Sequence, residues 1–234
     1  MLGRSGEEIF PQTVGPRILP LPGDSNPLGT YVVGKYQGGT MQDQPDQKTR
    51  PIHRSYPISI EHVSKNYGGA PVVDDLSFVV KPGRVTGFLG PNGAGKSTTM
   101  KILLGLASQT SGQATLGGFA YGERPNPTAT VGASGEADAF HPGRSGGDLL
   151  RSLADATGTS LERVDEVLDL VELSHAANRN AGAYSLGMKQ RLGLAAALLC
   201  DPPVLVLDEP GNGLDPQGIR TLRNLLRSRA AEGN

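Results

Sequence analysis

A glycine-rich segment near the middle of the chain has the residue types and spacing of a phosphate-binding loop. The segment reads GPNGAGKS (90–97) and lies between the apolar run RVTGFL and the helix-favouring run STTMKILLGL. Its glycines let backbone N–H groups curl around an anion, and the start of the following helix adds the positive end of a dipole. Lys96 would reach the β- and γ-phosphates, and the Ser97 hydroxyl would ligate Mg²⁺. The alternative is a glycine-rich turn that binds nothing. The candidate phosphate-binding residues are Gly90, Pro91, Asn92, Gly93, Ala94, Gly95, Lys96, Ser97 and Thr98.

Two adjacent carboxylates follow a second apolar run. The run VLVL (204–207) is typical of a buried strand, and Asp208 and Glu209 come directly after it. Open α/β sheets bind ligands at the carboxyl ends of their strands, so Asp208 could hold the Mg²⁺ shell there. Glu209 would polarise a water that attacks the γ-phosphate. The alternative is an acidic pair that only solvates the end of the strand.

Strands and helices alternate around these motifs. ISIEHV (58–63) alternates apolar and polar residues as a half-buried strand does, and VVDDLSFVVKPG (72–83) predicts a second strand pair that ends in a Pro-Gly turn. The Ala/Leu-rich stretch 186–199 favours a helix, which Pro202 and Pro203 stop. This alternation predicts an α/β domain around a largely parallel sheet.

A helical insert is expected between about 144 and 183. Thr159 and Glu162 have the spacing of a capping box at the start of a helix. Apolar residues then recur at helical intervals. These residues are Leu161, Val164, Val167, Leu168 and Val171.

Residues 1 to about 56 differ from the rest of the chain in amino-acid composition, and this composition predicts a disordered tail. Prolines interrupt every helix that could form there, and Gly, Gln and Asp are frequent. A short β-like patch at 30–33 could pair with another strand, although glycines on both sides weaken it. We therefore expect the folded domain to cover 57–234.

Charge and cysteine content exclude several classes of protein. The formal net charge of −1 provides no overall positive potential to attract the phosphates of nucleic acid, so we expect no nucleic-acid partner. The single cysteine, Cys200, excludes an internal disulfide and a cysteine-based zinc site, and it fits the cytosol. The longest apolar stretch, 192–200, is shorter than the roughly 20 residues of a membrane helix.

The segment AYSLGMKQRLGLAAALLCDPPVLVLDEPGNGLDPQGI (183–219) resembles the signature-to-D-loop region of ATP-binding cassette (ABC) transporter ATPases. The sequence of this segment most resembles that of the bacitracin-resistance and multidrug (ABC-2 type) exporter subunits, and the resemblance extends back to Ile58. It implies a P-loop NTPase with a mainly parallel central sheet and a small antiparallel β subdomain on the N-terminal side. The signature would lie on a helical subdomain at about 140–195.

The resemblance also implies roles for individual residues. Tyr67 lies at the position of the family's aromatic residue that stacks on adenine, with a plain surface tyrosine as the alternative. Ser185 and Gly187 belong to the signature motif, which faces the γ-phosphate of ATP held by a second subunit. Asp215 matches the D-loop at that dimer interface; the alternative is an Asp-Pro turn.

Two departures from the family pattern stand out. Glu136 replaces the usual Q-loop glutamine, and its carboxylate can still coordinate Mg²⁺. The family's switch histidine is missing, because the last histidine of the chain is His175, before the signature. We therefore expect a product that is truncated before the strand carrying that histidine. His141, in the looser stretch after Glu136, is expected to be a loop residue rather than a metal ligand.

Three functions are consistent with these features. The first is an ATP-hydrolysing subunit that works as a dimer and powers transport, expected to be export, through a separate membrane-spanning permease. Such a subunit is cytoplasmic and peripheral at the inner face of the membrane. The second is a truncated remnant that binds ATP without hydrolysing it. The third, a soluble ABC ATPase acting on ribosomes or DNA, would be expected to carry a second cassette or long coiled-coil inserts, and a basic surface, and the sequence shows none of these.

Overall fold

The computed structural model describes residues 17–20, 30–34, 56–135 and 140–232. The strands are β1 (Arg17–Pro20), β2 (Thr30–Gly34), β3 (Ile58–Lys65), β4 (Val73–Val80), β5 (Arg84–Leu89), β6 (Ser111–Leu116), β7 (Val131–Ser134) and β8 (Val204–Leu207). The α-helices are α1 (Lys96–Leu103), α2 (Gly146–Thr157), α3 (Leu161–Leu170), α4 (Leu186–Leu198) and α5 (Pro216–Ala231). Short 3₁₀ turns cover Tyr121–Glu123, Ser174–Ala176 and Ala181–Ala183.

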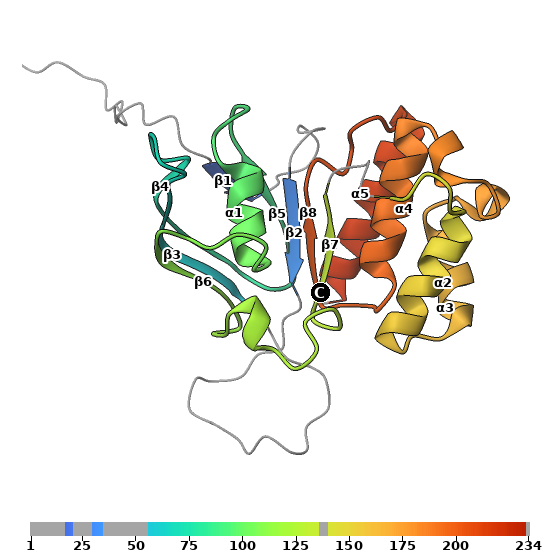
Figure 1. Ribbon diagram of the computed structural model, residues 1–234, viewed down its shortest axis with the longest axis horizontal. Helices are drawn as coiled ribbons and strands as arrows, with labels where there is room; N and C mark the ends of the chain where they lie inside the picture. The colour runs from blue at the N-terminus through green and yellow to red at the C-terminus, as the bar shows by residue number, and fades with distance from the viewer. Residues whose placement is uncertain (1–16, 21–29, 35–55, 136–139, 233–234) are drawn as a thin grey trace, which may run out of the picture.

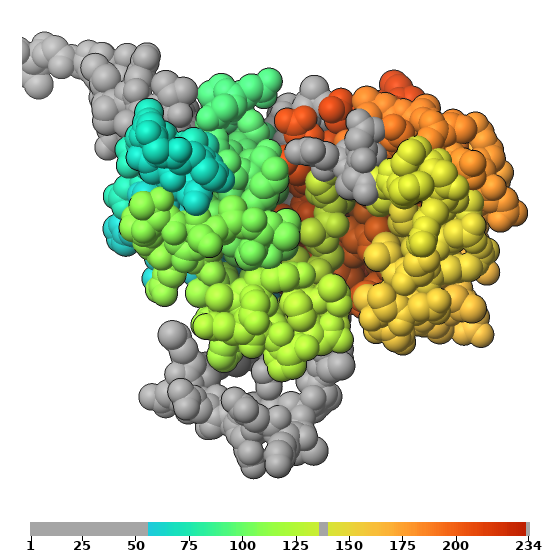
Figure 2. Space-filling view, viewed as in Figure 1, coloured from blue at the N-terminus to red at the C-terminus, as the bar shows by residue number. Residues whose placement is uncertain are grey.

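These elements form layers on both sides of a central sheet. A small antiparallel sheet of order β4-β3-β6 lies on one side, with α1 between it and the central sheet (Figure 1). Helices α4 and α5 lie on the other side, and α2 and α3 lie beyond them. The space-filling view shows the N-terminal sheet with α1 (cyan to green) and the helical region (yellow to orange) on opposite sides of the molecule (Figure 2).

The central sheet has the strand order β1-β5-β2-β8-β7. β8 is buried on both faces because its alternate side chains enter two different cores. Val204 and Val206 join the cluster around α1, whereas Leu205 and Leu207 join the cluster formed with α4 and α5. Since β2 is antiparallel to both β5 and β8, those two strands run parallel to each other, and β7 runs parallel to β8. The sheet is thus mixed, with three strands in one direction and β1 and β2 in the other.

Strands β1 and β2 lie within the region predicted to be a tail, which is a difference from the sequence prediction. The patch at 30–33 pairs on both sides, with β5 and with β8, and Arg17–Pro20 pairs with β5 at the sheet edge. Prolines break helices but are compatible with extended backbone, and Pro20 ends an edge strand, where a missing N–H is tolerated. The rest of the predicted tail up to residue 55 lies outside the described residues.

The helical region forms where the sequence predicts it, but one cap differs. Ser160, not Thr159, is the N-cap of α3, and its hydroxyl accepts from the N–H of Arg163. Thr159 bonds instead to the hydroxyl of Thr157 and to the sulfur of Cys200, which removes it from the helix start. Val164, Val167, Leu168 and Val171 are buried as expected, whereas Leu161 is 56% exposed.

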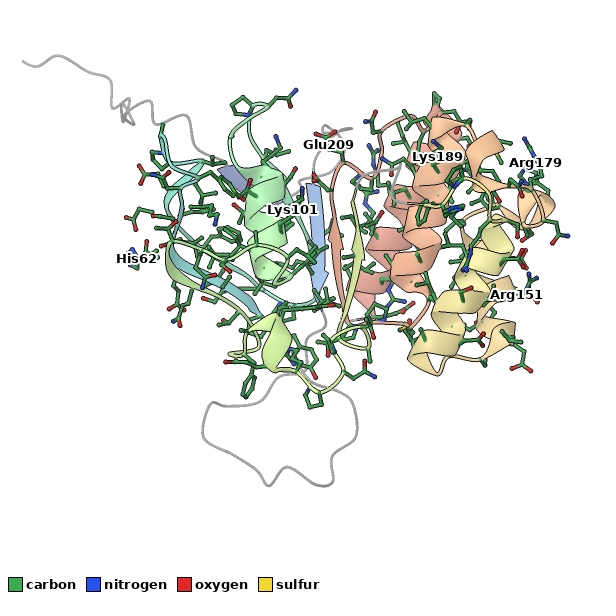
Figure 3. The ribbon with its side chains drawn as sticks, in the orientation of Figure 1. His62, Lys101, Arg151, Arg179, Lys189 and Glu209 are labelled. Atoms are coloured by element: carbon green, nitrogen blue, oxygen red, sulfur yellow. The ribbon has the colours of Figure 1, made fainter. Side chains whose placement is uncertain are left out.

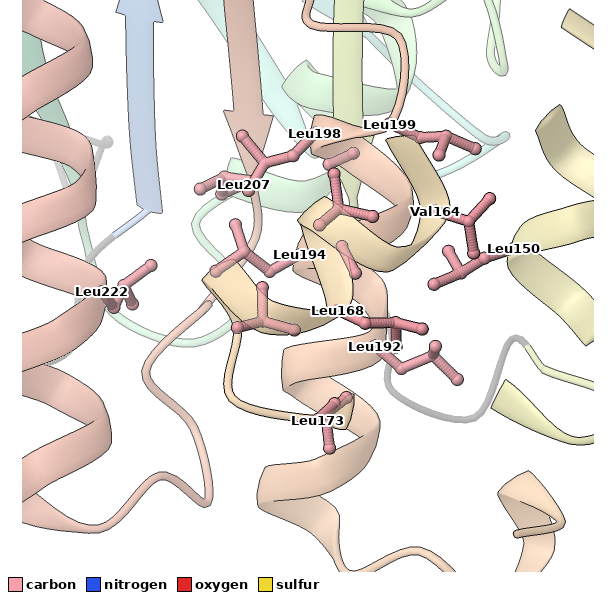
Figure 4. Close-up of a cluster of buried hydrophobic side chains, with 14 of the residues drawn as sticks. Leu150, Val164, Leu168, Leu173, Leu192, Leu194, Leu198, Leu199, Leu207 and Leu222 are labelled. Atoms are coloured by element: carbon pink, nitrogen blue, oxygen red, sulfur yellow. The ribbon is translucent and has the colours of Figure 1, made fainter. Parts of the chain in front are cut away.

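The core of this region joins the helices to the central sheet. Leu150 of α2, Val164 and Leu168 of α3, and Leu192 and Leu198 of α4 converge in one cluster (Figure 4).

The predicted strand pair at 72–83 is the single strand β4, whose antiparallel partner is β3. None of the helices within the described ranges is long and apolar enough to cross a membrane.

Candidate functional site

The predicted phosphate loop connects the end of β5 to the start of α1. Gly95 is the N-cap of α1 and has a φ of 81°, a conformation that glycine adopts without strain. A β-carbon on Gly95 would lie 2.5 Å from the carbonyl oxygen of Val72, so no larger residue fits there. The Nζ atom of Lys96 donates to the carbonyl oxygens of Gly90 (2.8 Å) and Pro91 (3.0 Å). The lysine therefore already lies along the loop.

The start of α1 is suited to an anion. Among the described residues no side chain caps this helix, and its first turn has no acidic residue. The first N–H groups of a helix have no intrahelical acceptor, so they are available to a ligand. Pro91, Asn92, Gly93 and Ser97 are exposed. The loop thus presents donors and a hydroxyl to solvent.

The register of β2 shows that the phosphate loop and the acidic pair lie at the same edge of the sheet. Tyr31 lies opposite Gly87 of β5 and opposite Leu207 of β8. Gly87 and Leu207 are therefore level, so β8 ends at this level and β5 ends two residues further on, at Leu89. Two strand spacings put these strands about 10 Å apart. Asp208 follows Leu207, and its N–H donates to the carbonyl oxygen of Ser134 at the end of β7 (2.8 Å).

Glu209 lies at the same end of the sheet, beyond the last residue of β8 (Figure 3). Its side chain is exposed and its backbone has a φ of 45°, which is uncommon for a residue other than glycine. Asp208 is half-buried. The two carboxylates therefore have different surroundings: Asp208 is partly covered at the end of the sheet, whereas Glu209 faces solvent.

The donor set at this edge fits Mg²⁺ held together with phosphates. Ser97 and Asp208 supply a hydroxyl and a carboxylate, which are oxygen donors of the kind Mg²⁺ prefers. Glu136, the third predicted ligand, lies outside the described residues. Within the described ranges no group of three or more His, Cys, Asp and Glu residues could hold a metal. A magnesium ion here would depend on phosphate and water oxygens for most of its shell, which is usual for this ion.

The predicted signature motif begins α4. Ser185 is the N-cap of this helix, and its hydroxyl accepts from the N–H of Met188 (3.2 Å). Ser185 is exposed and Gly187 is half-buried. Helices α1, α4 and α5 all begin at the edge of the central sheet where β5 and β8 end (Figure 1). The signature and the phosphate loop thus belong to the same end of the molecule.

Asp215, the predicted D-loop residue, is the N-cap of α5. Its Oδ1 accepts from the N–H of Gly218 (2.9 Å), and Pro216 occupies the first position of the helix. The Nη2 atom of Arg191 lies 3.7 Å from the same Oδ1. Asp215 therefore does more than form an Asp-Pro turn, because it joins α5 to α4.

Tyr67, the predicted adenine-stacking residue, lies in the loop between β3 and β4. Its side chain is 65% exposed, and the Nζ of Lys65 lies 4.6 Å from the ring centroid. The far end of the same loop, Val72, contacts Gly95 of the phosphate loop. His141 is also a loop residue: its Nδ1 accepts from the N–H of Gly143.

Two residues that contact this site were not predicted. Gln190 is buried and donates to the backbone carbonyl of Glu209 (3.2 Å), and Arg191 contacts Asp215. The sequence signal for these two residues was the polar pair Gln190 and Arg191 directly before the apolar run 192–199. A glutamine next to a buried helix face is expected to be buried itself and then requires a hydrogen-bond partner. Its partner could not be identified from spacing alone.

Comparison with known proteins gives one consistent result. Residues 73–212 match the family model described as ABC transporter. The chain is 42% identical over 179 residues to the bacitracin transport ATP-binding protein BcrA of Bacillus licheniformis, with 76% of this chain and 58% of that protein covered. It is 38% identical over 176 residues to the lantibiotic transport ATP-binding protein SrtF of Streptococcus pyogenes, with 75% of this chain and 76% of that protein covered.

Solved structures agree with these relatives. An ATP binding subunit of an ABC transporter is 28% identical and matches with a TM-score of 0.66, with 75% of each chain covered. This match supports the predicted fold class. The chain spans 58% of the length of BcrA from Bacillus licheniformis.

Proposed function

The chain belongs to the ATP-binding family of ABC transporters, as its sequence predicted, and we propose that it binds and hydrolyses MgATP to power transport through a separate membrane-spanning partner. The observation that carries the proposal is the common level of Gly87 and Leu207 opposite Tyr31. This register supports a single site formed by the phosphate loop and the acidic pair. Neither motif alone would distinguish nucleotide hydrolysis from simple anion binding.

Nucleotide binding rests on the loop 90–98. The ammonium of Lys96, which now donates to the carbonyls of Gly90 and Pro91, would exchange these contacts for β- and γ-phosphate oxygens. Tyr67 would stack on the adenine ring through the face that Lys65 does not occupy. Ser97, Asp208 and Glu136 would hold Mg²⁺, which supplies positive charge against the phosphates.

Hydrolysis rests on Glu209. Its exposed carboxylate would accept a hydrogen bond from the attacking water and orient it towards the γ-phosphate. Asp208, at the edge of the sheet beside β7, would remain a ligand rather than a base. Two adjacent carboxylates would thus divide metal binding and proton acceptance between them.

The exposed start of α4 supports a dimer in which each subunit completes the other's site. Ser185 and Gly187 would place the N-terminus of α4 against the γ-phosphate bound by the second copy, and Asp215 would lie at the interface. We expect the Glu209→Gln variant to form a dimer with MgATP, measured by light scattering, because it would bind ATP without consuming it. A monomer at saturating MgATP would contradict this arrangement.

A relative named Nod factor export ATP-binding protein I, from Burkholderia orbicola, favours export as the direction of transport. BcrA is named for bacitracin transport and SrtF for lantibiotic transport. By this analogy the chain would act at the inner face of the cell membrane through a permease. Co-purification of an integral membrane protein with the tagged chain is the expected result, and co-purification of ribosomes instead would favour a soluble ABC ATPase.

Two variants test the nucleotide site. Lys96→Ala should weaken binding of a fluorescent ATP analogue roughly 100-fold, because charge-assisted hydrogen bonds of up to about 3 kcal/mol are lost. Glu209→Gln should keep the binding and lose phosphate release by at least about 100-fold. Lys81→Ala is the control, because it removes one exposed lysine before β5, at the opposite end of that strand from the loop.

Each outcome has a defined meaning. Parental binding by Lys96→Ala would show that the phosphate site is wrong. Parental phosphate release by Glu209→Gln would show that the base is wrong. Tight binding by a parental chain that releases no phosphate would favour the ATP-binding remnant that does not hydrolyse ATP.

A further inference from the structure

Gln190 is a buried polar residue whose side chain points at the backbone of the proposed base. It lies in α4 with 6% of its surface exposed, and its Nε2 donates to the carbonyl oxygen of Glu209 at 3.2 Å. The part of α4 that follows Gln190 is apolar and packed, with Leu192 fully buried. A buried amide is costly unless it is hydrogen-bonded, so this contact fixes the orientation of the Gln190 side chain.

The carbonyl that Gln190 contacts belongs to a residue with unusual backbone geometry. Glu209 has a φ of 45°, and such conformations persist where surrounding contacts hold them. Two donors converge on its carbonyl oxygen: Gln190 Nε2 and the N–H of Asn212, at 3.0 Å. The direction of the Glu209 side chain therefore depends on a hydrogen bond from α4.

The next residue of α4 holds the other end of the same segment. The Nη1 atom of Arg191 donates to the carbonyl of Val171 (3.0 Å) and to Oε2 of Glu172 (2.5 Å). Its Nη2 lies 3.7 Å from Oδ1 of Asp215. Adjacent side chains of one helix thus contact the segment 209–215 at its first and last residues.

We propose that Gln190 is a positioning residue that holds the backbone of Glu209 so that its carboxylate faces the attacking water. The inference rests on the proposed function, because it takes Glu209 as the base. It adds a physical link between two motifs, since Ser185 is the N-cap of the same helix. A displacement at the start of α4 reaches Glu209 through one side chain.

The test replaces the amide and keeps the volume. In Gln190→Met the side chain stays long and unbranched but cannot donate to the Glu209 carbonyl. We expect kcat for phosphate release to fall about 10- to 100-fold, because misplacing a reacting group by about 1 Å costs up to 10²-fold. ATP affinity should stay within about twofold of the parental value, because the hydrogen bond that is lost goes to Glu209 and not to the loop 90–98.

A second measurement does not depend on turnover. The N–H of Asn212 donates to the same carbonyl, so hydrogen exchange of a peptide covering 204–215 should become faster in Gln190→Met. Gln113→Met is the matched control: it loses an exposed amide hydrogen bond to Glu61 in the N-terminal sheet and should leave turnover and this peptide unchanged.

The outcomes separate this inference from the proposed function. Unchanged exchange and parental kcat in Gln190→Met would overturn the positioning role. A fall in Tm with parental kcat would show a purely structural role and would also overturn it. If the parental chain releases no phosphate, the proposed function fails; faster exchange would then still support the contact with Glu209, and unchanged exchange would refute it.

Discussion

Gly187 lies so close to Gly213 that a β-carbon on Gly187 would come within 2.6 Å of the carbonyl oxygen of Gly213. Gly213 in turn has a φ of 72°, and a β-carbon there would meet the side chain of Leu186. The start of α4 and the segment after the acidic pair are therefore in backbone contact. The close packing of these two segments therefore depends on Gly187 and Gly213, which lack side chains.

We expect Gly187→Ala to disturb this contact and lower phosphate release. The obstacle is a backbone carbonyl, so the clash is relieved only if α4 or the segment 209–215 moves. Overpacking of this kind costs about 1–3 kcal/mol. For a chain of this size that corresponds to a fall in Tm of roughly 2–12 °C, at about 2–4 °C per kcal/mol, measured by thermal unfolding.

Gly122→Ala serves as the control for this substitution. A β-carbon on Gly122 would meet nothing within 4 Å, and the residue is exposed. Its Tm and its phosphate release should match those of the parental chain. Equal behaviour of the two alanine variants would show that the approach of Gly187 to Gly213 carries no energetic weight.

The ion pair between Arg191 and Glu172 should make stability depend on pH. The hydrogen bond from Arg191 lowers the pKa of Glu172 below its ordinary value; burial opposes this effect, and a hydrogen bond from Thr221 adds to it. A carboxyl whose pKa is lower in the folded state stabilises that state above its unfolded pKa of about 4.5 and loses this effect as the pH falls through the folded value.

Glu172→Gln tests this dependence. Its side chain is 47% exposed, so solvent screening limits the pair to about 1 kcal/mol or less. The variant should melt below the parental chain at pH 7, and the two Tm values should converge as the pH falls through the folded pKa of Glu172, which lies below 4.5. A constant difference in Tm between pH 3 and pH 7 would exclude ionisation of Glu172 as its source.

The sequence predicts the local backbone at two motifs, the loop 90–97 between a strand and a helix and Asp208 after a strand, because local backbone rules determine both. The phosphate loop is a contiguous segment, and Ser185 and Asp215 cap their own helices through contacts three residues away. Contacts between distant segments were not predictable. The pairing of Tyr31 with Leu207 and the hydrogen bond from Gln190 to Glu209 depend on tertiary packing, which no spacing rule encodes.

Competition between neighbours explains a smaller error. Thr159 and Ser160 are both good N-cap residues, and the spacing to Glu162 favoured Thr159. The structure assigns the cap to Ser160 because Thr159 contacts Thr157 and Cys200. A one-residue choice between equivalent caps is decided by what else each hydroxyl can reach.

Strand β2 should be required for nucleotide binding, because within the described part of the sheet it alone joins β5 to β8. Val32 lies opposite Thr86 of β5 and opposite Val206 of β8. Val32→Pro removes a backbone N–H from the middle of this central strand, where proline is not tolerated. Binding of the fluorescent ATP analogue should weaken at least about tenfold, because the phosphate loop and the acidic pair lose their common register.

The same substitution in β1 provides the comparison. Among the described strands Ile18 pairs with Phe88 alone, at the edge of the sheet, and edge strands accept proline more readily. Ile18→Pro should therefore weaken ATP binding much less than Val32→Pro. If both variants bound ATP as tightly as the parental chain, β2 would not be what holds β5 and β8 in register, and the common level of Gly87 and Leu207 would need another support.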